Sequence, residues 1–308
     1  MFPYQADVSM QRWPLANWAV IAVTVVLSVA ARSLPGEVYL QLAHWTGNPA
    51  AAAERINAQA GTPVIDPNTL KEYGFHAWQL VTSAFLHGGT WHLLGNMIFL
   101  FVFGNAVNAK IGHLPYLGLY LAYAAVTGAA WHLSPGNGLL CIGASGAIMG
   151  VAGMFAVLYP LNDISIFTFL LYRPAVFRLS AVWVLLGYFI LDLLGFLGPS
   201  DGISHVSHLS GMLSGTAVTA AAVGFGIIRP RRGEKTLLEI LGTKVKREEP
   251  YERPGSKPVY VTTVQPPQMR PSSGTTAKPE TASGQPAVPE RRGAESPPDD
   301  LPPIELEP

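Results

Sequence analysis

Six long apolar runs limit what this chain of 308 residues can fold into. An α-helix needs about 20 residues to cross the ~30 Å hydrocarbon core of a bilayer, and each run is close to that length. Lipid cannot hydrogen-bond the backbone of an open strand, so helices are the expected form of these segments. The sequence therefore predicts an all-α, polytopic membrane protein. Its six predicted spans are residues 15–33, 91–110, 116–133, 142–159, 178–197 and 205–225.

The charge content supports a lipid environment and excludes some partners. Charged residues make up 13% of the chain, about half of the roughly 25% that is usual in soluble domains. The net charge is zero and no basic stripe is present, so we expect the lipid bilayer as a partner and no nucleic acid. The single cysteine, Cys141, rules out an intrachain disulfide.

Lysine and arginine residues near the ends of the spans predict their orientation. With the N-terminus in the cytoplasm, eight of these residues fall inside, and three fall outside, in or beside a long outer loop at about 34–90. We therefore expect both termini in the cytoplasm and a location in the inner (cytoplasmic) membrane. The inside residues are Arg12, Lys110, Arg173, Arg178, Arg229, Arg231, Arg232 and Lys235, and the outside residues are Arg32, Arg55 and Lys71.

Three regions follow from this pattern: a cytoplasmic N-terminal segment (1–14), a six-helix domain (15–228) and a cytoplasmic tail (229–308). Of the 26 prolines, 15 lie beyond Arg229. A segment so rich in proline and charge cannot bury enough apolar surface to offset its chain entropy, so we expect the tail to be largely disordered. A short helix is expected within 234–248. The composition of the tail identifies no partner.

The first apolar run has a second interpretation, a signal peptide that is removed. Ser28-Val29-Ala30 resembles a signal-peptidase site. However, the residues before the run include Asp7 against a lone Arg12, and the run is longer than the apolar core of a typical signal. We therefore expect a retained first span.

Polar residues recur at one depth in three of the spans. His92 with Asn96, Ser145 and His208 each lie within about the first two turns of spans two, four and six, which enter the membrane from the same side. A serine becomes a nucleophile when a neutral imidazole accepts its proton, and His208 is the candidate base. His92 and Asn96 lie one turn apart on one face. With the backbone N–H of Ser145, they offer donors that could stabilise an oxyanion.

Glycines accompany the serine and the helix that carries it. Gly143 and Gly146 bracket Ser145, where close approach of either a substrate or a neighbouring helix would explain them. For the deeper glycines we expect helix packing alone. These are Gly150, Gly153 and Gly215.

Other interpretations remain for the same residues. Four histidines could form a metal site, but no carboxylate or cysteine is expected at their depth, so we expect no metal there. Asp192 is the one carboxylate clearly inside an apolar run; we expect it to face water, which leaves a serine–histidine dyad. A non-catalytic adaptor that binds helices is a second functional class, and a transporter is disfavoured because no inverted repeat is evident. The four histidines are His87, His92, His205 and His208.

Together these motifs resemble the rhomboid family of intramembrane serine proteases, of the bacterial type. G-x-S-G appears at Gly143–Gly146, H-x-x-x-N at His92–Asn96, and H-x-x-G-x-x-x-G at His208–Gly215. The resemblance covers roughly residues 15–228. It implies a six-transmembrane-helix bundle and a serine-type endopeptidase.

The resemblance also implies residue roles. Ser145 would be the nucleophile and His208 the general base and acid. His92, Asn96 and the Ser145 amide would form the oxyanion hole, supported by Gly143. Substrates would be transmembrane segments of other proteins, entering past span five, and no cofactor is implied.

Overall fold

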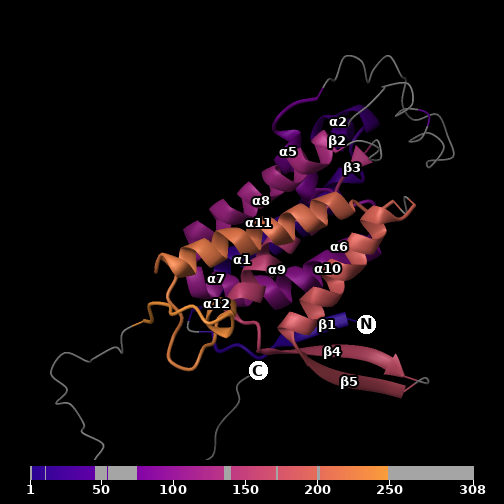
Figure 1. Ribbon diagram of the computed structural model, residues 1–308. Helices are drawn as coiled ribbons and strands as arrows, with labels where there is room; N and C mark the ends of the chain where they lie inside the picture. Colours follow the sequence, from indigo (N-terminus) through magenta and orange to yellow (C-terminus); the bar gives the residue numbers. More distant parts are fainter. Residues whose placement is uncertain are drawn as a thin grey trace, which may run out of the picture. The chain divides into compact units, whose positions relative to one another are not determined.

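The computed structural model describes residues 2–10, 12–45, 54, 75–134, 140–170, 173–199 and 202–248. Within these residues, six long helical segments correspond to the six predicted spans (Figure 1). The second segment is continuous but contains a π-helical stretch, η2. The six segments are α1 (Leu15–Ala31), α6 (Thr90–Phe99) with η2 (Leu100–Gly104) and α7 (Asn105–Ile111), α8 (His113–Leu133), α9 (Ser145–Leu158), α10 (Ala181–Leu197) and α11 (His205–Gly224).

Short elements lie at the two ends of these helices. The prediction of an all-α chain needs correction, because the described residues include a three-stranded antiparallel sheet of order β1-β4-β5 and an antiparallel pair, β2-β3. Residues 178–180, predicted to begin the fifth span, belong to β5. The short elements are β1 (Phe2–Ala6), α2 (Gly36–Leu42), β2 (His44–Trp45), α5 (Gln79–Thr82), η1 (Ser83–Phe85), β3 (Leu140–Cys141), β4 (Asp163–Leu170), β5 (Arg173–Ser180) and α12 (Leu237–Ile240).

Helix α9 is buried at the centre of the bundle and lies directly against α11. A Cβ atom at Gly211 would collide with the carbonyl oxygen of Gly146, and one at Gly215 with that of Gly150. Both contact pairs advance in the same direction along the chain, so α9 and α11 are parallel. Small residues at this interface let the two backbones approach closely.

The other glycines of α9 also serve packing. A Cβ at Gly146 would lie 2.6 Å from Oγ1 of Thr127 on α8, and one at Gly153 would collide with the carbonyl oxygen of Met212. The packing role predicted for the deeper glycines is confirmed, and Gly146 has the same explanation.

Helix α6 begins at the same end of the bundle as α9 and α11. Near its start, His92 lies beside Gly143, just ahead of α9. Further along, in η2, the ring of Phe103 is 5.2 Å from that of Phe155 near the end of α9. The three helices that carry the polar motifs therefore run in the same direction, which brings those motifs together.

The π-helical stretch η2 lies where α1 crosses the second helical segment. A π-bulge leaves a backbone carbonyl without its usual helical partner. The carbonyl oxygen of Leu100 accepts a hydrogen bond from Nδ2 of Asn17 at 3.0 Å, and the same amide nitrogen donates to Oδ1 of Asn105 at 2.8 Å. The hydroxyl of Tyr116 donates to Oδ1 of Asn17. This network fixes α1 against the bundle.

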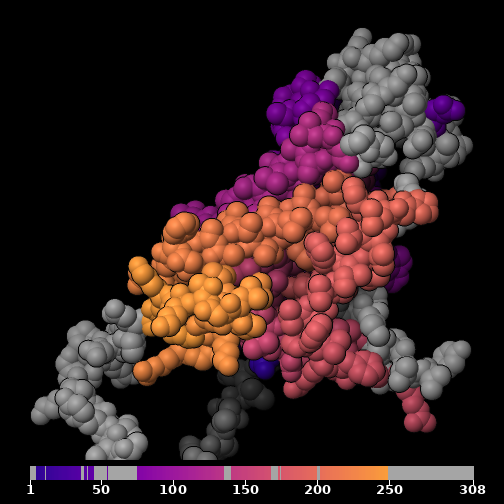
Figure 2. Space-filling model, viewed as in Figure 1, coloured from indigo at the N-terminus to yellow at the C-terminus, as the bar shows by residue number. Residues whose placement is uncertain are grey.

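The segment after α11 packs against the bundle at the end where α11 finishes (Figure 2). Leu237, Leu238 and Val245 contact the main hydrophobic core. The predicted tail, 229–308, is thus folded as far as residue 248, and α12 is a short helix within 234–248, as expected. Beyond residue 248 the tail lies outside the described residues, and its disorder stays a prediction.

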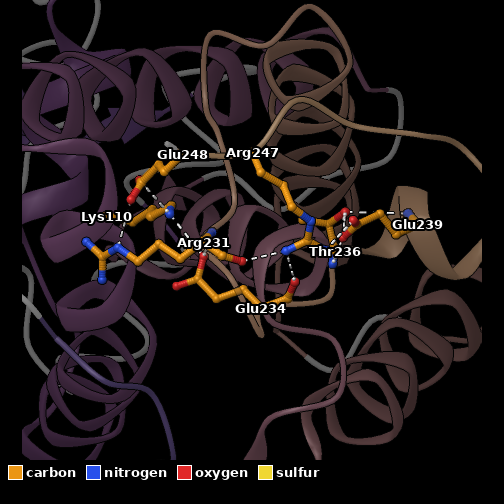
Figure 3. Close-up of polar contacts among 7 residues, drawn as sticks. All are labelled: Lys110, Arg231, Glu234, Thr236, Glu239, Arg247 and Glu248. Carbon is orange, nitrogen blue, oxygen red and sulfur yellow. Dashed lines mark hydrogen bonds and ion pairs between the residues drawn. The ribbon is translucent and has the colours of Figure 1, made fainter. Parts of the chain in front are cut away.

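Polar contacts fasten this segment to α7 (Figure 3). Nζ of Lys110 donates to carboxylate oxygens of Glu234 and Glu248, both at 3.0 Å. Helix α12 begins with a capping box in which Thr236 and Glu239 exchange hydrogen bonds between side chains and backbone. We call the seven residues of Figure 3 the ion-pair cluster: Lys110, Arg231, Glu234, Thr236, Glu239, Arg247 and Glu248.

Length and hydropathy mark one described helix, Thr90–Ile111, as long and apolar enough to cross a membrane. Three other apolar helices are shorter, namely Leu15–Ala31, Ser145–Leu158 and Ala181–Leu197. Helix α10 exposes Trp183, Leu191, Leu194 and Leu197, and exposed apolar surface of this kind is typical of contact with lipid or another protein. The six-span count remains a prediction.

Candidate active site

A tight backbone turn places Ser145 at the first residue of α9. Gly143 has φ +124°, which disfavours any residue with a side chain, and a Cβ there would lie 2.8 Å from Cε1 of His92. The N–H of Gly143 donates to the carbonyl oxygen of Ser83 at 3.0 Å, which holds the turn in place. The first N–H groups of a helix have no intrahelical partner and lie at the positive end of its dipole. Negative charge developing beside Ser145 would therefore be stabilised.

The imidazole of His208 is in hydrogen-bond contact with Ser145. Nε2 of His208 lies 2.8 Å from Oγ of Ser145. The contact exists because α9 and α11 are parallel and packed through glycines, which brings the starts of both helices together. The structure thus joins the two residues that the sequence singled out.

Asp192 also belongs to this site, against expectation. It was expected to face water apart from the serine and histidine, but it is buried, and its Oδ1 lies 2.8 Å from Nδ1 of His208. An ionised carboxylate can only accept hydrogen bonds, so Nδ1 of His208 carries the proton. Nε2 is then left to accept the proton of the Ser145 hydroxyl. The arrangement is a row of carboxylate, imidazole and hydroxyl.

A second imidazole shares the same carboxylate oxygen. Nδ1 of His205 lies 2.8 Å from Oδ1 of Asp192. His205 is three residues before His208, so both rings lie on one face of α11. Gly195 makes room for the His205 ring, because a Cβ at that position would collide with it.

His92 and Asn96, both on α6, lie beside Gly143. Nδ2 of Asn96 would be 3.7 Å from a Cβ at Gly143, so the amide is close to the turn that precedes Ser145. His92 is solvent-exposed and Asn96 is buried. Both predicted oxyanion donors thus lie beside the turn that leads into Ser145. Their catalytic roles stay predictions.

His87 holds Asn96 and the turn together, a role that the sequence did not assign to it. Nε2 of His87 accepts from Nδ2 of Asn96 at 2.8 Å and from the N–H of Ala144 at 3.4 Å. Its Nδ1 lies 2.9 Å from Oγ of Ser28, whose hydroxyl donates to the carbonyl oxygen of Phe85. Burial lowers the pKa of His87 to about 4, and repulsion from His92 adds to this, so the ring is neutral at pH 7.

The four histidines that the sequence allowed as one metal site do not form one group in the structure. His87 and His92 contact each other, with ring centroids 5.0 Å apart, whereas His205 and His208 gather around Asp192. Among the described residues, the side chains whose ligand atoms converge are Asp192, His205 and His208, all within 4.8 Å of one another.

Comparison with known proteins identifies the family. The family model of the Rhomboid domain matches residues 74–225, the stretch that carries every residue of this site except Ser28. The chain belongs to the rhomboid family. Rhomboid proteins are membrane proteins, so the helices described above form a bundle in a membrane.

Several curated relatives share part of this rhomboid chain. Rhomboid-like protein 11, chloroplastic, from Arabidopsis thaliana is 30% identical over 171 residues, which cover 47% of this chain and 53% of the relative. Rhomboid protein 1, mitochondrial, from Saccharomyces cerevisiae is 35% identical over 105 residues, which cover 32% of this chain and 30% of the relative. Rhomboid protease GlpG from Haemophilus influenzae is 26% identical over 151 residues, covering 47% and 69%. The chain spans about half or less of the length of the first two relatives.

Proposed function

We propose that this rhomboid is an intramembrane serine endopeptidase that cleaves transmembrane segments of other membrane proteins. The observation that carries the proposal is the 2.8 Å contact between Oγ of Ser145 and Nε2 of His208. A nucleophile and a base within hydrogen-bond reach, with the base oriented by a third group, are the pattern of covalent hydrolysis. One of the relatives reported above, from Haemophilus influenzae, is named a rhomboid protease, which agrees with this proposal.

In this mechanism His208 accepts the proton of Ser145 as Oγ attacks the scissile carbonyl carbon. The N–H of Ser145 and the side chains of His92 and Asn96 stabilise the oxyanion that forms. His208 then donates the proton to the leaving amine, and water hydrolyses the acyl-enzyme in a second cycle of the same transfers. Asp192 holds the tautomer of His208 and stabilises the imidazolium formed in between.

The proposed setting is an inner (cytoplasmic) membrane, with six spans and both termini in the cytoplasm. The starts of α6, α9 and α11 then lie just below the outer surface, where water can reach the site. The substrate would be a protein with a single transmembrane helix that unwinds easily near its outer end and is cut beside a small residue. It would enter past α10. In the half of this helix that is nearer the site, only Asp192 is buried, so that half is loosely packed against the bundle.

The decisive experiment compares two serine variants in proteoliposomes with a transmembrane reporter. We expect Ser145→Ala to lower the cleavage rate by more than about 10⁴-fold, because loss of the nucleophile removes the covalent route. Ser210→Ala is the matched control, since Ser210 is two residues from His208 but its hydroxyl donates to the carbonyl oxygen of Ser207. Unchanged cleavage by Ser145→Ala would end the proposal.

Labelling with a fluorophosphonate separates a protease from an adaptor on the same scaffold. A protease should label at Ser145, and Ser145→Ala should abolish that labelling while Ser210→Ala keeps it. A wild-type chain that binds transmembrane helices but neither cleaves nor labels would be an adaptor.

A further inference from the structure

Asp192, His205 and His208 form a compact group of potential metal ligands. One oxygen of Asp192 is 2.8 Å from Nδ1 of both histidines, and all three ligand atoms lie within 4.8 Å of one another. The three side chains are only 10–14% exposed, so they are shielded yet still reachable from solvent. We call these three residues the Asp–His–His group.

We propose that the Asp–His–His group binds one zinc-type divalent cation, and that the bound ion blocks the general base. The blocking effect rests on the proposed protease function, whereas the binding does not. Two imidazole nitrogens and one carboxylate oxygen are a set of three protein ligands typical of Zn²⁺, with water in the fourth position. Mg²⁺ and Ca²⁺ prefer oxygen ligands and are not expected to bind.

The backbone prearranges these ligands. His205 and His208 project from one face of α11 because they are three residues apart, and Asp192 faces them from α10. Gly195 provides the space for the His205 ring. In the absence of an ion, the Nδ1–H groups donate to the carboxylate, which keeps all three side chains directed at one point.

Ligation changes the tautomer of His208. A neutral imidazole carries one proton, so a metal ion on the Nδ1 lone pair leaves that proton on Nε2. A metal-bound histidine usually donates its other ring N–H to an outer acceptor, and here Oγ of Ser145 is in place 2.8 Å away. Nε2 then donates instead of accepting and cannot take the serine proton. No net proton is gained or lost, and the Asp192 hydrogen bonds are replaced by metal–ligand bonds.

Binding is tested on the full chain carrying Ser145→Ala, which keeps all three ligands and needs no activity. We expect calorimetry to show one Zn²⁺ per chain, and Co²⁺ to give the visible absorption of a four-coordinate site. Adding His205→Gln or Asp192→Asn should weaken binding by at least about tenfold, since loss even of an outer partner costs that much. Thermal unfolding of each variant verifies that it is folded.

The matched control for binding is His132→Gln in the same background. His132 lies 3.0 Å from Nε2 of His44, so it belongs to another histidine pair of this chain. It should leave the affinity for Zn²⁺ unchanged. The proposal is overturned if Zn²⁺ does not bind, if binding survives both ligand substitutions, or if His132→Gln abolishes it.

Inhibition is tested with chains that retain Ser145. We expect Zn²⁺ to slow cleavage, EDTA to restore it and Mg²⁺ to have no effect. Each variant is compared with its own zinc-free rate, and His205→Gln should need at least about tenfold more Zn²⁺ for half inhibition. Equal sensitivity of His205→Gln and wild type would overturn the blocking effect. Zinc binding without any cleavage by wild type would instead refute the proposed function and leave the metal site standing.

Discussion

At the end of the bundle where α9 and α11 begin, a hydroxyl, two imidazoles and one carboxylate are linked by hydrogen bonds. At the end where α7 finishes, the ion-pair cluster joins three cations to three carboxylates (Figure 3). Both groups consist of polar side chains held between helices. They differ in whether their charges are already compensated.

In the ion-pair cluster each carboxylate drawn has a cationic partner of opposite charge, and proton transfer would only weaken the pairing. Burial alone would raise the pKa of Glu248, but hydrogen bonds from Lys110 and Arg231 outweigh it and lower that pKa. Around Ser145, by contrast, a proton can move along the row, because the imidazole has a donor on one side and an acceptor on the other. The first region is therefore suited to proton transfer, and the second to holding the fold together.

Among the changes that test this comparison between the two ends, Asp192→Asn should have the largest effect. An asparagine amide can donate to Nδ1 of His208 and so stabilise the tautomer with its proton on Nε2, which cannot accept from Ser145. In a serine protease such a change lowers kcat by up to about 10⁴-fold. We expect a large fall in kcat with little change in KM, measured with the reporter in proteoliposomes.

Asp192→Glu is the control for position, because it keeps the carboxylate and should recover part of the lost kcat. A purely structural role predicts something else: Asp192→Asn would then reduce the amount of folded protein and leave kcat per folded molecule unchanged. That outcome would remove Asp192 from the mechanism.

The position of Asp192 illustrates what the sequence could and could not predict. The helix positions were readable because length and hydropathy are local properties; the run predicted at 205–225 is α11, His205–Gly224. The sequence did not predict which side of α10 faces the bundle. This helix is apolar all round, exposing Trp183 while burying Leu185, so no amphipathic pattern directed Asp192 toward α11.

The sheet was missed for a different reason. Strand β1 pairs with β4 across some 160 residues of sequence, with Phe2 opposite Phe167. Strand pairing depends on the partner, and nothing within a five-residue segment identifies a partner so far away. The meeting of Ser145 with His208 was predictable because both are near the start of spans that enter from the same side.

A medium effect, on stability alone, is expected from Lys110→Met. The Lys110 side chain is 2% exposed and contacts two carboxylates, Glu234 and Glu248. Removing one partner of a fully buried pair costs about 3–5 kcal/mol, and because Glu248 is 41% exposed we expect about 1–3 kcal/mol here. Denaturant unfolding in detergent measures this loss, and the cleavage rate per folded molecule should not change.

Lys235→Met is the matched control in the same segment. Lys235 is solvent-exposed, so its loss should change the free energy of unfolding by no more than about 0.5 kcal/mol. If Lys110→Met and Lys235→Met unfold alike, the ion-pair cluster contributes nothing to stability. If Lys110→Met lowers the rate per folded molecule, the division between a chemical and a structural end is wrong.

The smallest effect is on the pH dependence of stability and comes from His87. This residue can titrate, like those of the site, but its role is structural, because it holds the turn before Ser145. Its pKa falls from 6.5 to about 4 on burial, with a further contribution from His92. As pH drops from 6.5 toward 4, the unfolded chain takes up a proton that the folded chain does not, so stability is lost in this window. His87→Gln should flatten the decrease in melting temperature between pH 7 and about 4.

His44→Gln is the comparison. Burial also lowers the pKa of His44 to about 4, and repulsion from His132 adds to this, so His44 titrates in the same window. Because a protonated His87 cannot accept from Asn96 and Ala144, only His87→Gln should also change the labelling of Ser145 by a fluorophosphonate. Equal pH profiles for wild type and His87→Gln would show that the turn does not depend on a neutral ring.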